Sequence, residues 1–147
     1  MKLSVSSCYG TRVVLDIARH ETDGPVTTAE IALRQNISRA YLEEILRPLQ
    51  QNNLVKSYRG TKGGHQLAKK PHQVTVGEVI ALYEGPTLIP CVTSCKSCKQ
   101  MTRCPIRPVW KKASTVLFDH LYKVTFADLM LGEHPLFDDR TKERKRT

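Results

Sequence analysis

Four of the five cysteines in this 147-residue sequence lie within one short segment, CVTSCKSCKQMTRC. They are Cys91, Cys95, Cys98 and Cys104, at the spacing C-x3-C-x2-C-x5-C. Closely spaced thiolates bind iron-sulfur clusters or zinc, and Cys95 with Cys98 forms the C-x2-C half of a zinc site. A third chemistry is thiol oxidation, with Cys91, Cys95 and Cys98 as the reactive groups. The segment therefore predicts a metal-binding or redox-active loop.

The cellular compartment bears on the choice between a metal site and disulfide bonds. No apolar run reaches the ~18 residues of a membrane span, and the opening MKLSVSSCYGTRVVLDIARH lacks the apolar region of a signal peptide. We therefore expect a cytoplasmic protein with no membrane partner, in which thiols stay reduced. Five cysteines are also an odd number, which internal disulfides alone do not use up.

The charge of the chain points to a polyanion as partner. Lysine and arginine number 23 against 14 aspartates and glutamates, so the formal net charge is +9. Such an excess favours double-stranded DNA as the binding partner. The length fits one domain with a single core.

Two short helices joined by a tight corner are predicted between residues 27 and 52. Thr27 and Glu30 form a capping box at the start of the first helix. Asn36 tolerates the left-handed backbone of a corner, and Ser38 caps the second helix. The second helix has one apolar face, formed by Leu42, Ile45, Leu46 and Leu49. This pattern predicts a helix-turn-helix, and the alternative is an antiparallel pair of core helices.

A basic, glycine-rich hairpin is predicted directly after these helices, in LVKSYRGTKGGHQLA. Its strands are expected at Val55 to Tyr58 and His65 to Leu67, with Arg59 and Lys62 on the loop between them. A hairpin in this place forms the wing of a winged helix, although an ordinary solvated turn is the alternative reading. The fold class that we predict is mostly α, a winged helix-turn-helix with a small β-hairpin wing and a long C-terminal dimerisation helix.

The predicted helix-turn-helix and its wing are together called the reader below. Several of their side chains are candidates for contact with DNA. Arg39 suits guanine O6 and N7, whereas Arg59 suits a narrow minor groove. Glu43 either points away from DNA or accepts a hydrogen bond from a cytosine amino group. The candidate DNA-binding residues are Thr28, Ser38, Arg39, Tyr41, Glu43, Arg59 and Lys62.

One further helix is predicted at the start of the chain and three beyond the wing. Ser6 or Ser7 is expected to cap the first helix of the chain, and Thr75 with Glu78 forms a second capping box. Pro105 is expected to start a long helix over 105–124, whose apolar face meets either the core or a twin in a dimer. Thr125 is expected to cap the last helix. The predicted regions are a DNA-binding domain (1–84), a cysteine loop (85–104), a dimerisation helix with the short helix after it (105–132) and a disordered polar tail (133–147).

The order of these segments resembles the Rrf-two family of winged-helix transcription regulators. The resemblance lies in the opening MKLSVSSCYGTRVVLDIA, the segment ISRAYLEEILRPLQQNNLV, the wing SYRGTKGGHQLAK, the helix start TVGEVI, the cysteine loop, and VTFADLM. It extends from Met1 to about Gly132. The family includes an iron-sulfur cluster regulator, a nitric-oxide-sensing repressor and a repressor of cysteine metabolism. The resemblance implies a homodimer in which the long helices cross and each cysteine loop lies near the partner's DNA-binding domain.

The resemblance also implies a set of cluster ligands. Cluster-bearing members use three loop cysteines and a fourth ligand that varies between members. In some, an acidic residue at the start of helix one reaches over from the other subunit, and the matching residue here is Cys8. In others, a histidine follows the last cysteine by three residues, and the residue here is Arg107, which cannot coordinate iron. The implied ligands of a [2Fe-2S] or [4Fe-4S] cluster are Cys91, Cys98, Cys104 and Cys8 of the partner subunit, with Cys95 as the alternative fourth ligand.

Together these features predict a dimeric repressor whose binding to a palindromic operator is controlled by an iron-sulfur cluster that senses redox state, nitric oxide or iron supply. Half-sites ~34 to 36 Å apart fit such a dimer. The alternatives are a zinc-binding or thiol-redox regulator of the same fold, an iron-sulfur electron carrier, and, for Cys8 alone, a small buried apolar residue. We do not expect an enzyme. The glycine-rich segment RGTKGG lies in a hairpin rather than between a strand and a helix, so it is not a nucleotide-binding motif. The histidines are scattered, with no nucleophile placed near them.

Overall fold

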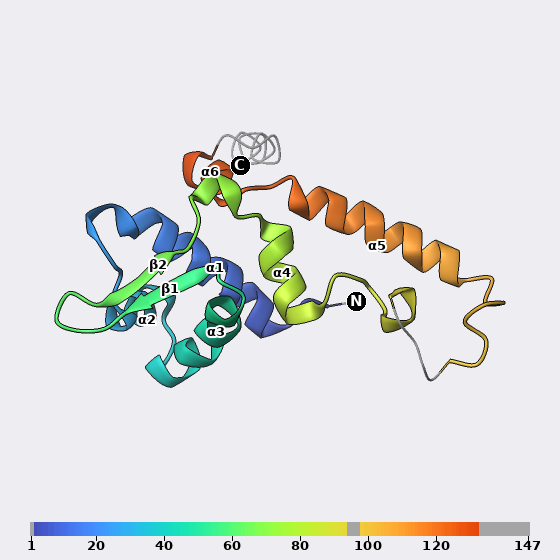
Figure 1. Cartoon of the computed structure of the whole chain (residues 1–147), viewed down its shortest axis with the longest axis horizontal. Helices are drawn as coiled ribbons and strands as arrows, with labels where there is room; N and C mark the ends of the chain where they lie inside the picture. The colour runs from blue at the N-terminus through green and yellow to red at the C-terminus, as the bar shows by residue number, and fades with distance from the viewer. Residues whose placement is uncertain (1, 94–97, 133–147) are drawn as a thin grey trace, which may run out of the picture.

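The computed structural model describes residues 2–93 and 98–132, and it separates into a body and an arm (Figure 1). The body comprises residues 2–84 and 125–132, and the arm comprises residues 85–93 and 98–124. The arm leaves the body at the end of α4 and returns to it at the start of α6. The elements are α1 (Val5–His20), η1 (Glu21–Asp23), α2 (Thr28–Gln35), α3 (Arg39–Gln51), β1 (Val55–Tyr58), β2 (Gly64–Leu67), η2 (Pro71–Gln73), α4 (Val76–Glu84), η3 (Pro90–Val92), α5 (Arg107–Tyr122) and α6 (Phe126–Leu131).

The core of the body forms around α1. Its apolar residues recur at helical spacing, and Val13, Val14 and Ile17 are fully buried. Helices α2, α3, α4 and α6 and strand β2 all pack on α1. The other core residues are Val26, Ile31, Ala32, Leu42, Ile45, Leu46, Leu49, Leu54, Val55, Val74, Val79 and Phe126.

The predicted helix-turn-helix is confirmed in its local details. The Thr27 side chain accepts from the Glu30 N–H, and the Glu30 carboxylate accepts from the Thr27 N–H, so the capping box forms. Asn36 ends α2 in the left-handed region at φ 55°. Ser38 caps α3 by accepting from the Tyr41 N–H. Helix α3 runs through Pro48 to Gln51, and its four predicted apolar residues are all buried.

The wing is a two-stranded antiparallel sheet whose register pairs Val55 with Leu67 and Tyr58 with Gly64. The second strand begins one residue earlier than predicted, at Gly64. Gly64 has φ 153° and lies so close to the backbone of Val26 that a side chain there would collide with it. The close approach allows Val26 and His65 to exchange two backbone hydrogen bonds, at 2.9 and 2.8 Å, which join the wing to the segment before α2.

The start of α1 differs from the prediction. The capping residue is Ser4, whose side chain accepts from the Ser7 N–H, rather than Ser6 or Ser7. A contact from outside the helix explains the choice, because the Ser4 N–H donates to Glu84 Oε1 of α4 at 2.7 Å. The cap is therefore selected by tertiary structure, and three nearby serines look alike in the sequence.

The arm returns to the body through a short bridge between Thr75 and Thr125. The Val76 N–H donates to Val124 O at 2.9 Å, and the Phe126 N–H donates to Val74 O at 3.0 Å. Thr75 forms a capping box with Glu78, and Thr125 forms one with Asp128. The sequence predicted the capping box at Thr75 and the capping role of Thr125. Two helices thus start side by side where the chain comes back.

Helix α5 forms most of the arm and is shorter than predicted, because it spans Arg107–Tyr122 instead of 105–124. At ~1.5 Å per residue its 16 residues extend for about 24 Å. Helix α5 packs on α4 of the same chain, and Ser114 and Phe118 are its buried residues. Gly77 of α4 permits this close approach, because a Cβ there would lie 2.6 Å from the ring of Tyr122.

Candidate DNA-binding surface and cysteine loop

The first turn of α3 presents polar side chains to solvent. Ser38 and Arg39 are exposed, whereas Tyr41 is half-buried, with its ring edge-on to Tyr9 at 5.7 Å. Because Ser38 Oγ already accepts from the Tyr41 N–H, the hydroxyl proton of Ser38 is left to donate outward. The helix start therefore offers a hydroxyl and a guanidinium to a polyanion.

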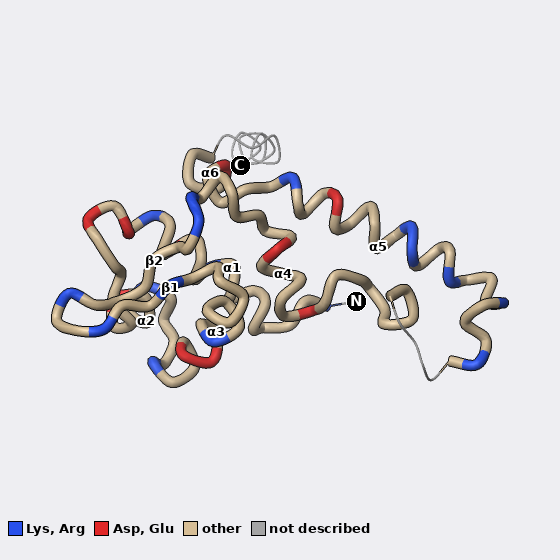
Figure 2. The backbone as a smooth tube through the Cα atoms, viewed as in Figure 1, with Lys and Arg blue, Asp and Glu red and all other residues tan. Residues whose placement is uncertain are grey.

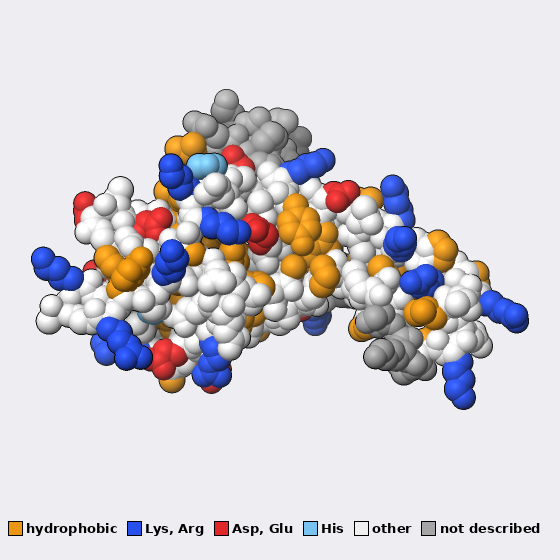
Figure 3. All heavy atoms as spheres, in the orientation of Figure 1, with side chains coloured by type: hydrophobic (Ala, Val, Ile, Leu, Met, Phe, Trp, Pro, Cys, Tyr) orange, Lys and Arg blue, Asp and Glu red, His pale blue; other side chains and the backbone are white. Residues whose placement is uncertain are grey.

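The wing carries its two predicted cations at the tip. Arg59 and Lys62 are exposed, and the turn between them uses Gly60 at φ 103°. Figure 2 shows basic positions at the loop of the hairpin, and Figure 3 shows lysine and arginine side chains gathered over the same end of the body. The wing tip and the α3 start thus carry exposed positive charge on the body, and Glu43 of α3 is also exposed.

A buried histidine joins the wing to α2. His65 Nε2 lies 3.0 Å from Thr28 Oγ1, and His65 Nδ1 lies 2.9 Å from Ser57 Oγ. Burial lowers the pKa of His65, and the carboxylate of Glu43 acts in the opposite direction. His65 was not among the predicted site residues. Its signal in the sequence was its place within the strand, where alternate side chains face the helices.

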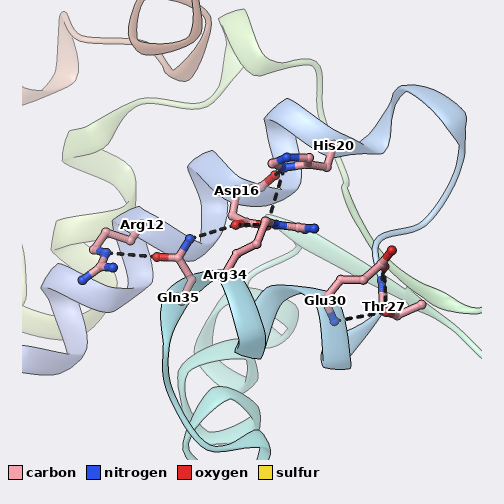
Figure 4. A network of polar contacts seen from close by, with 7 residues as sticks. All are labelled: Arg12, Asp16, His20, Thr27, Glu30, Arg34 and Gln35. Carbon is pink, nitrogen blue, oxygen red and sulfur yellow. Dashed lines mark hydrogen bonds and ion pairs between the residues drawn. The ribbon is translucent and has the colours of Figure 1, made fainter.

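A second polar group clamps α2 against α1 (Figure 4). Asp16 is buried on α1, and Arg34 of α2 donates to it through two nitrogens, at 2.7 to 3.1 Å. Gln35 Nε2 also donates to Asp16 Oδ2 at 2.8 Å, and Arg12 donates to Gln35. The hydrogen bond with Asp16 raises the pKa of Arg34. Sequence reasoning missed this group, although a lone acid within the apolar repeat of a helix was a visible signal.

The structure places the predicted cysteines on two separate elements. Cys91 and Cys104 are half-buried and Cys98 is exposed in the arm, whereas Cys8 is exposed in the first half of α1. Cys95 lies outside the described residues. Within residues 2–93 and 98–132, no three His, Cys, Asp or Glu side chains come close enough to share a metal ion. Cys8 is not a buried apolar residue in this chain, because its side chain is exposed.

Arg107 holds the two ends of the cysteine loop together. Its Nε donates to the carbonyl oxygen of Cys91 at 3.0 Å, and its Nη2 donates to that of Val92 at 3.4 Å. Its own N–H donates to the carbonyl oxygen of Cys104 at 3.4 Å. The residue that cannot coordinate iron therefore supports the backbone beside two of the predicted ligands.

The thiols of the cysteine loop and of α1 are donors of the kind that iron-sulfur clusters use. Cys8, Cys91, Cys98 and Cys104 are free thiols, and thiolates are the usual ligands of such clusters. Cationic side chains accompany them in Lys99, Arg103 and Arg107. Positive charge favours thiolates and the net negative charge of a thiolate-bound cluster.

The side of α5 that faces away from α4 carries exposed apolar residues. Val109 and Val116 are 55% and 58% exposed, and they lie one heptad apart. At ~100° per residue, Val116 lies opposite buried Ser114 and Phe118. The apolar face predicted for 105–124 consists of residues with different burial: Val124 is buried, Ala113, Leu117 and Leu121 are half-buried, and Val116 and His120 are exposed.

Two helices that meet at a left-handed corner, with a hairpin directly after them, define a winged helix-turn-helix protein. Residues 3–132 match the family Rrf2, described as an iron-dependent transcriptional regulator, and the chain belongs to this family. Its members are DNA-binding transcriptional regulators rather than enzymes. Among the described residues, no helix has both the length and the apolar character needed to cross a membrane.

Individual relatives agree with this assignment. The chain is 40% identical over 131 residues to protein Rrf2 of Nitratidesulfovibrio vulgaris, which covers 88% of this chain and 87% of the relative. The fold is similar to the structure of IscR from T. potens, with a TM-score of 0.70 and 34% identity over 91% of this chain and 89% of that one. It is also similar to CymR, the global cysteine regulator of B. subtilis, with a TM-score of 0.72 and 29% identity over 91% and 99% of the two chains.

Proposed function

We propose that the protein is a dimeric transcriptional repressor whose affinity for a palindromic operator is controlled by an iron-sulfur cluster. The observation that carries the proposal is the distribution of free thiols. Three exposed or half-buried thiols lie in the arm, and Cys8 is exposed on α1, which supports both reader helices. A cluster shared between an arm and the α1 of another copy would therefore act directly on the reader.

The proposed ligands are Cys91, Cys98, Cys104 and Cys8 of the partner subunit, and Cys95 is the alternative to Cys8. The cluster would supply a redox-active and nitric-oxide-reactive group at the interface between two copies. The residues of the chain do the rest. Arg107 fixes the loop backbone, the exposed apolar side of α5 contacts the second copy, and α1 carries the constraint to α2 and α3. A coupling of ~1 to 3 kcal/mol between cluster and operator corresponds to ~5 to 150-fold in affinity.

Metal analysis of protein purified without oxygen tests the cluster. We expect a brown protein with matched iron and acid-labile sulfide in the wild type. Loss or change of the visible spectrum in Cys8→Ala, with an unchanged spectrum in Cys95→Ser, supports Cys8 as the fourth ligand. The reverse result assigns Cys95. Colourless protein that contains zinc, or no metal, contradicts the cluster and favours zinc or thiol chemistry in the same loop.

The DNA contacts are tested separately, with a duplex that the wild-type protein selects from a random-sequence library. Arg39→Ala is expected to weaken binding by ~1 to 3 kcal/mol and to relax specificity at one base pair. Lys62→Ala is expected to weaken binding to all sequences alike and to reduce the salt slope by about one. Lys123→Ala, beyond the C-terminal end of α5, is the control. Equal binding by all three variants contradicts the proposed reader surface.

Comparison of apo and cluster-loaded protein on the same duplex tests the switch itself. A difference within the range given above is expected, together with a change in oligomeric state or in salt slope. Equal affinity of the two forms would refute regulation by the cluster, while leaving the DNA-binding assignment intact.

A further inference from the structure

The hydrogen bonds around His65 connect three elements of the reader. Thr28 belongs to the first turn of α2, Ser57 and His65 face each other across the wing, and Gln50 lies near the end of α3. Gln50 Nε2 donates to Ser57 Oγ at 2.6 Å, Ser57 Oγ lies 2.9 Å from His65 Nδ1, and His65 Nε2 lies 3.0 Å from Thr28 Oγ1. The four side chains therefore form one continuous chain.

The chemistry of the donors favours one direction for this chain. An amide NH₂ group only donates, so Ser57 Oγ accepts from Gln50. The hydroxyl proton of Ser57 can then be donated to His65 Nδ1, which requires the tautomer of His65 that carries its proton on Nε2. That N–H donates to Thr28 Oγ1. With its oxygen accepting from the imidazole, Thr28 keeps its own hydroxyl proton free for a further acceptor.

The position of Thr28 indicates which acceptor that is. A pocket of about 330 Å³ opens beside it, lined by Thr28 and His65 together with Glu43, Arg47 and Gln50 of α3. Thr28 is also the first residue of α2, where backbone N–H groups point out of the helix and favour an anion. A free hydroxyl proton at a helix start, at the edge of the reader, suits a phosphate oxygen of DNA.

We propose that His65 is a positioning residue for DNA binding: it holds the Thr28 hydroxyl with its proton directed outward to a DNA phosphate. The same series of hydrogen bonds links this contact, through Ser57, to Gln50 of α3. The inference rests on the proposed function, in which the surface around Thr28 and α3 contacts DNA. It goes further because it assigns a role to a buried side chain that does not itself touch the nucleic acid.

A double-mutant cycle measures the coupling between the two side chains. Thr28→Val removes the hydroxyl at nearly constant shape, and His65→Phe removes both ring nitrogens while it keeps an apolar ring in the buried site. With the selected duplex at fixed salt, Thr28→Val is expected to weaken binding by about 3- to 10-fold in the wild type. In the His65→Phe background the same change is expected to cost less than about 2-fold. Thr28→Ser is expected to restore near wild-type binding in the wild-type background.

Two results overturn the proposal. Equal losses from Thr28→Val in both backgrounds show that His65 does not orient the hydroxyl, and no loss in either background shows that Thr28 does not contact DNA. If Arg39→Ala and Lys62→Ala still weaken binding in the second case, the reader stands and only the relay is wrong. If those variants also bind normally, the proposed function fails with it. His72→Phe, which changes an exposed histidine in η2, is the matched control.

Nitrogen NMR of the unmodified protein tests the chain without any substitution at His65. In ¹⁵N-labelled protein, the imidazole of His65 is expected to be neutral with its proton on Nε2. Ser57→Ala removes the donor to Nδ1 and is expected to change the Nδ1 shift while the protein stays folded. A proton on Nδ1 in the wild type would reverse the direction of the chain, turn the Thr28 proton inward, and overturn the proposal even if His65→Phe fails to fold.

Discussion

The body and the arm differ in how completely each satisfies its own side chains. Among the described residues, no buried polar side-chain atom lacks a hydrogen-bond partner. The apolar residues of α1, α2 and α3 that face the core are buried by elements of the same chain. Along α5, by contrast, Val109 and Val116 stay exposed, and three free thiols accompany them in the cysteine loop. The core of the body is complete within one chain, although Val5 and Leu33 on its surface are also exposed. The arm differs because it combines exposed apolar residues with three free thiols.

This difference teaches where regulation can enter the molecule. The reader is fixed internally by Asp16 and His65, so a signal cannot act by completing it. In the proposed function, the signal acts on the arm and at Cys8, where free thiols are available. The following predictions test that division, and they run from the largest expected change in folding stability to the smallest.

Phe126→Ala is expected to destabilise the body most. Phe126 is fully buried in the core although it follows the arm in the chain, and removal of a buried phenylalanine ring costs about 3 to 5 kcal/mol. Urea unfolding followed by circular dichroism measures the change. Leu131→Ala on the same helix is the control, because Leu131 is 67% exposed and should cost little. A small effect of Phe126→Ala would mean that α6 contributes little to the free energy of unfolding of the body.

Asp16→Ala is expected to destabilise the body by about 1.5 to 3 kcal/mol, the usual value of hydrogen bonds to a charged group. The loss is smaller than for Phe126 because Arg34, left without its partner, is partly exposed and can be hydrated. The same variant should weaken DNA binding, since α2 loses its clamp to α1. Asp119→Ala on the exposed side of α5 is the control, and equal unfolding midpoints for the two variants would count against the clamp.

The stability of the body is expected to fall as the pH falls below about 6.5, the ordinary pKa of histidine. Burial lowers the pKa of His65, so the unfolded chain takes up a proton in a range where the folded chain does not. Of the charged groups nearby, the carboxylate of Glu43 favours the protonated form of His65, and Arg47 lines the same pocket as His65. His65→Phe is expected to flatten the profile between pH 5 and about 6.5, and an unchanged profile would assign the pH dependence to other groups.

Val116→Glu is expected to leave the folding of a single chain nearly unchanged, within about 0.5 kcal/mol, and to abolish association. A charge at an exposed position costs little in the monomer, but it would be buried in a dimer that uses this side of α5. Sedimentation equilibrium measures the oligomeric state. Thr115→Glu, at the preceding residue, is the control, and persistence of a dimer in Val116→Glu would place the interface elsewhere.

Arg107→Ala is expected to have the smallest effect on stability and a clear effect on the loop. The variant loses the hydrogen bonds to the carbonyl oxygens of Cys91 and Val92, which tie the loop to α5. Alkylation of Cys91 and Cys104 should therefore become faster, whereas Cys8 should react at the wild-type rate. Arg103→Ala is the control within the loop.

Local patterns predicted most of the body, because a capping box or a helix corner needs only neighbouring residues. Thr27 with Glu30, Asn36 and Ser38 could be placed from the sequence for this reason. Tertiary partners could not: Ser4 was chosen over Ser6 by a bond to Glu84, and Asp16 and His65 derive their roles from residues 18 and 37 positions away. The cysteine positions were plain in the sequence, but the proposed ligand set came from the family resemblance and stays a prediction. The four region boundaries and the DNA contacts also stay predictions. The predicted tail at 133–147 lies outside the described residues.

The bridge between Thr75 and Thr125 bears on how the protein is synthesised. Phe126 fills the core beside Val13 and Val14, which leave the ribosome more than a hundred residues earlier. A nascent chain therefore cannot close the core of the reader until the whole arm has been translated and α6 has docked. Contacts this distant in sequence slow folding, since a large loop must close before they form. Cys8 and the cysteine loop are all synthesised before Phe126, so the ligands of the proposed cluster are present in the nascent chain before the core of the body can close.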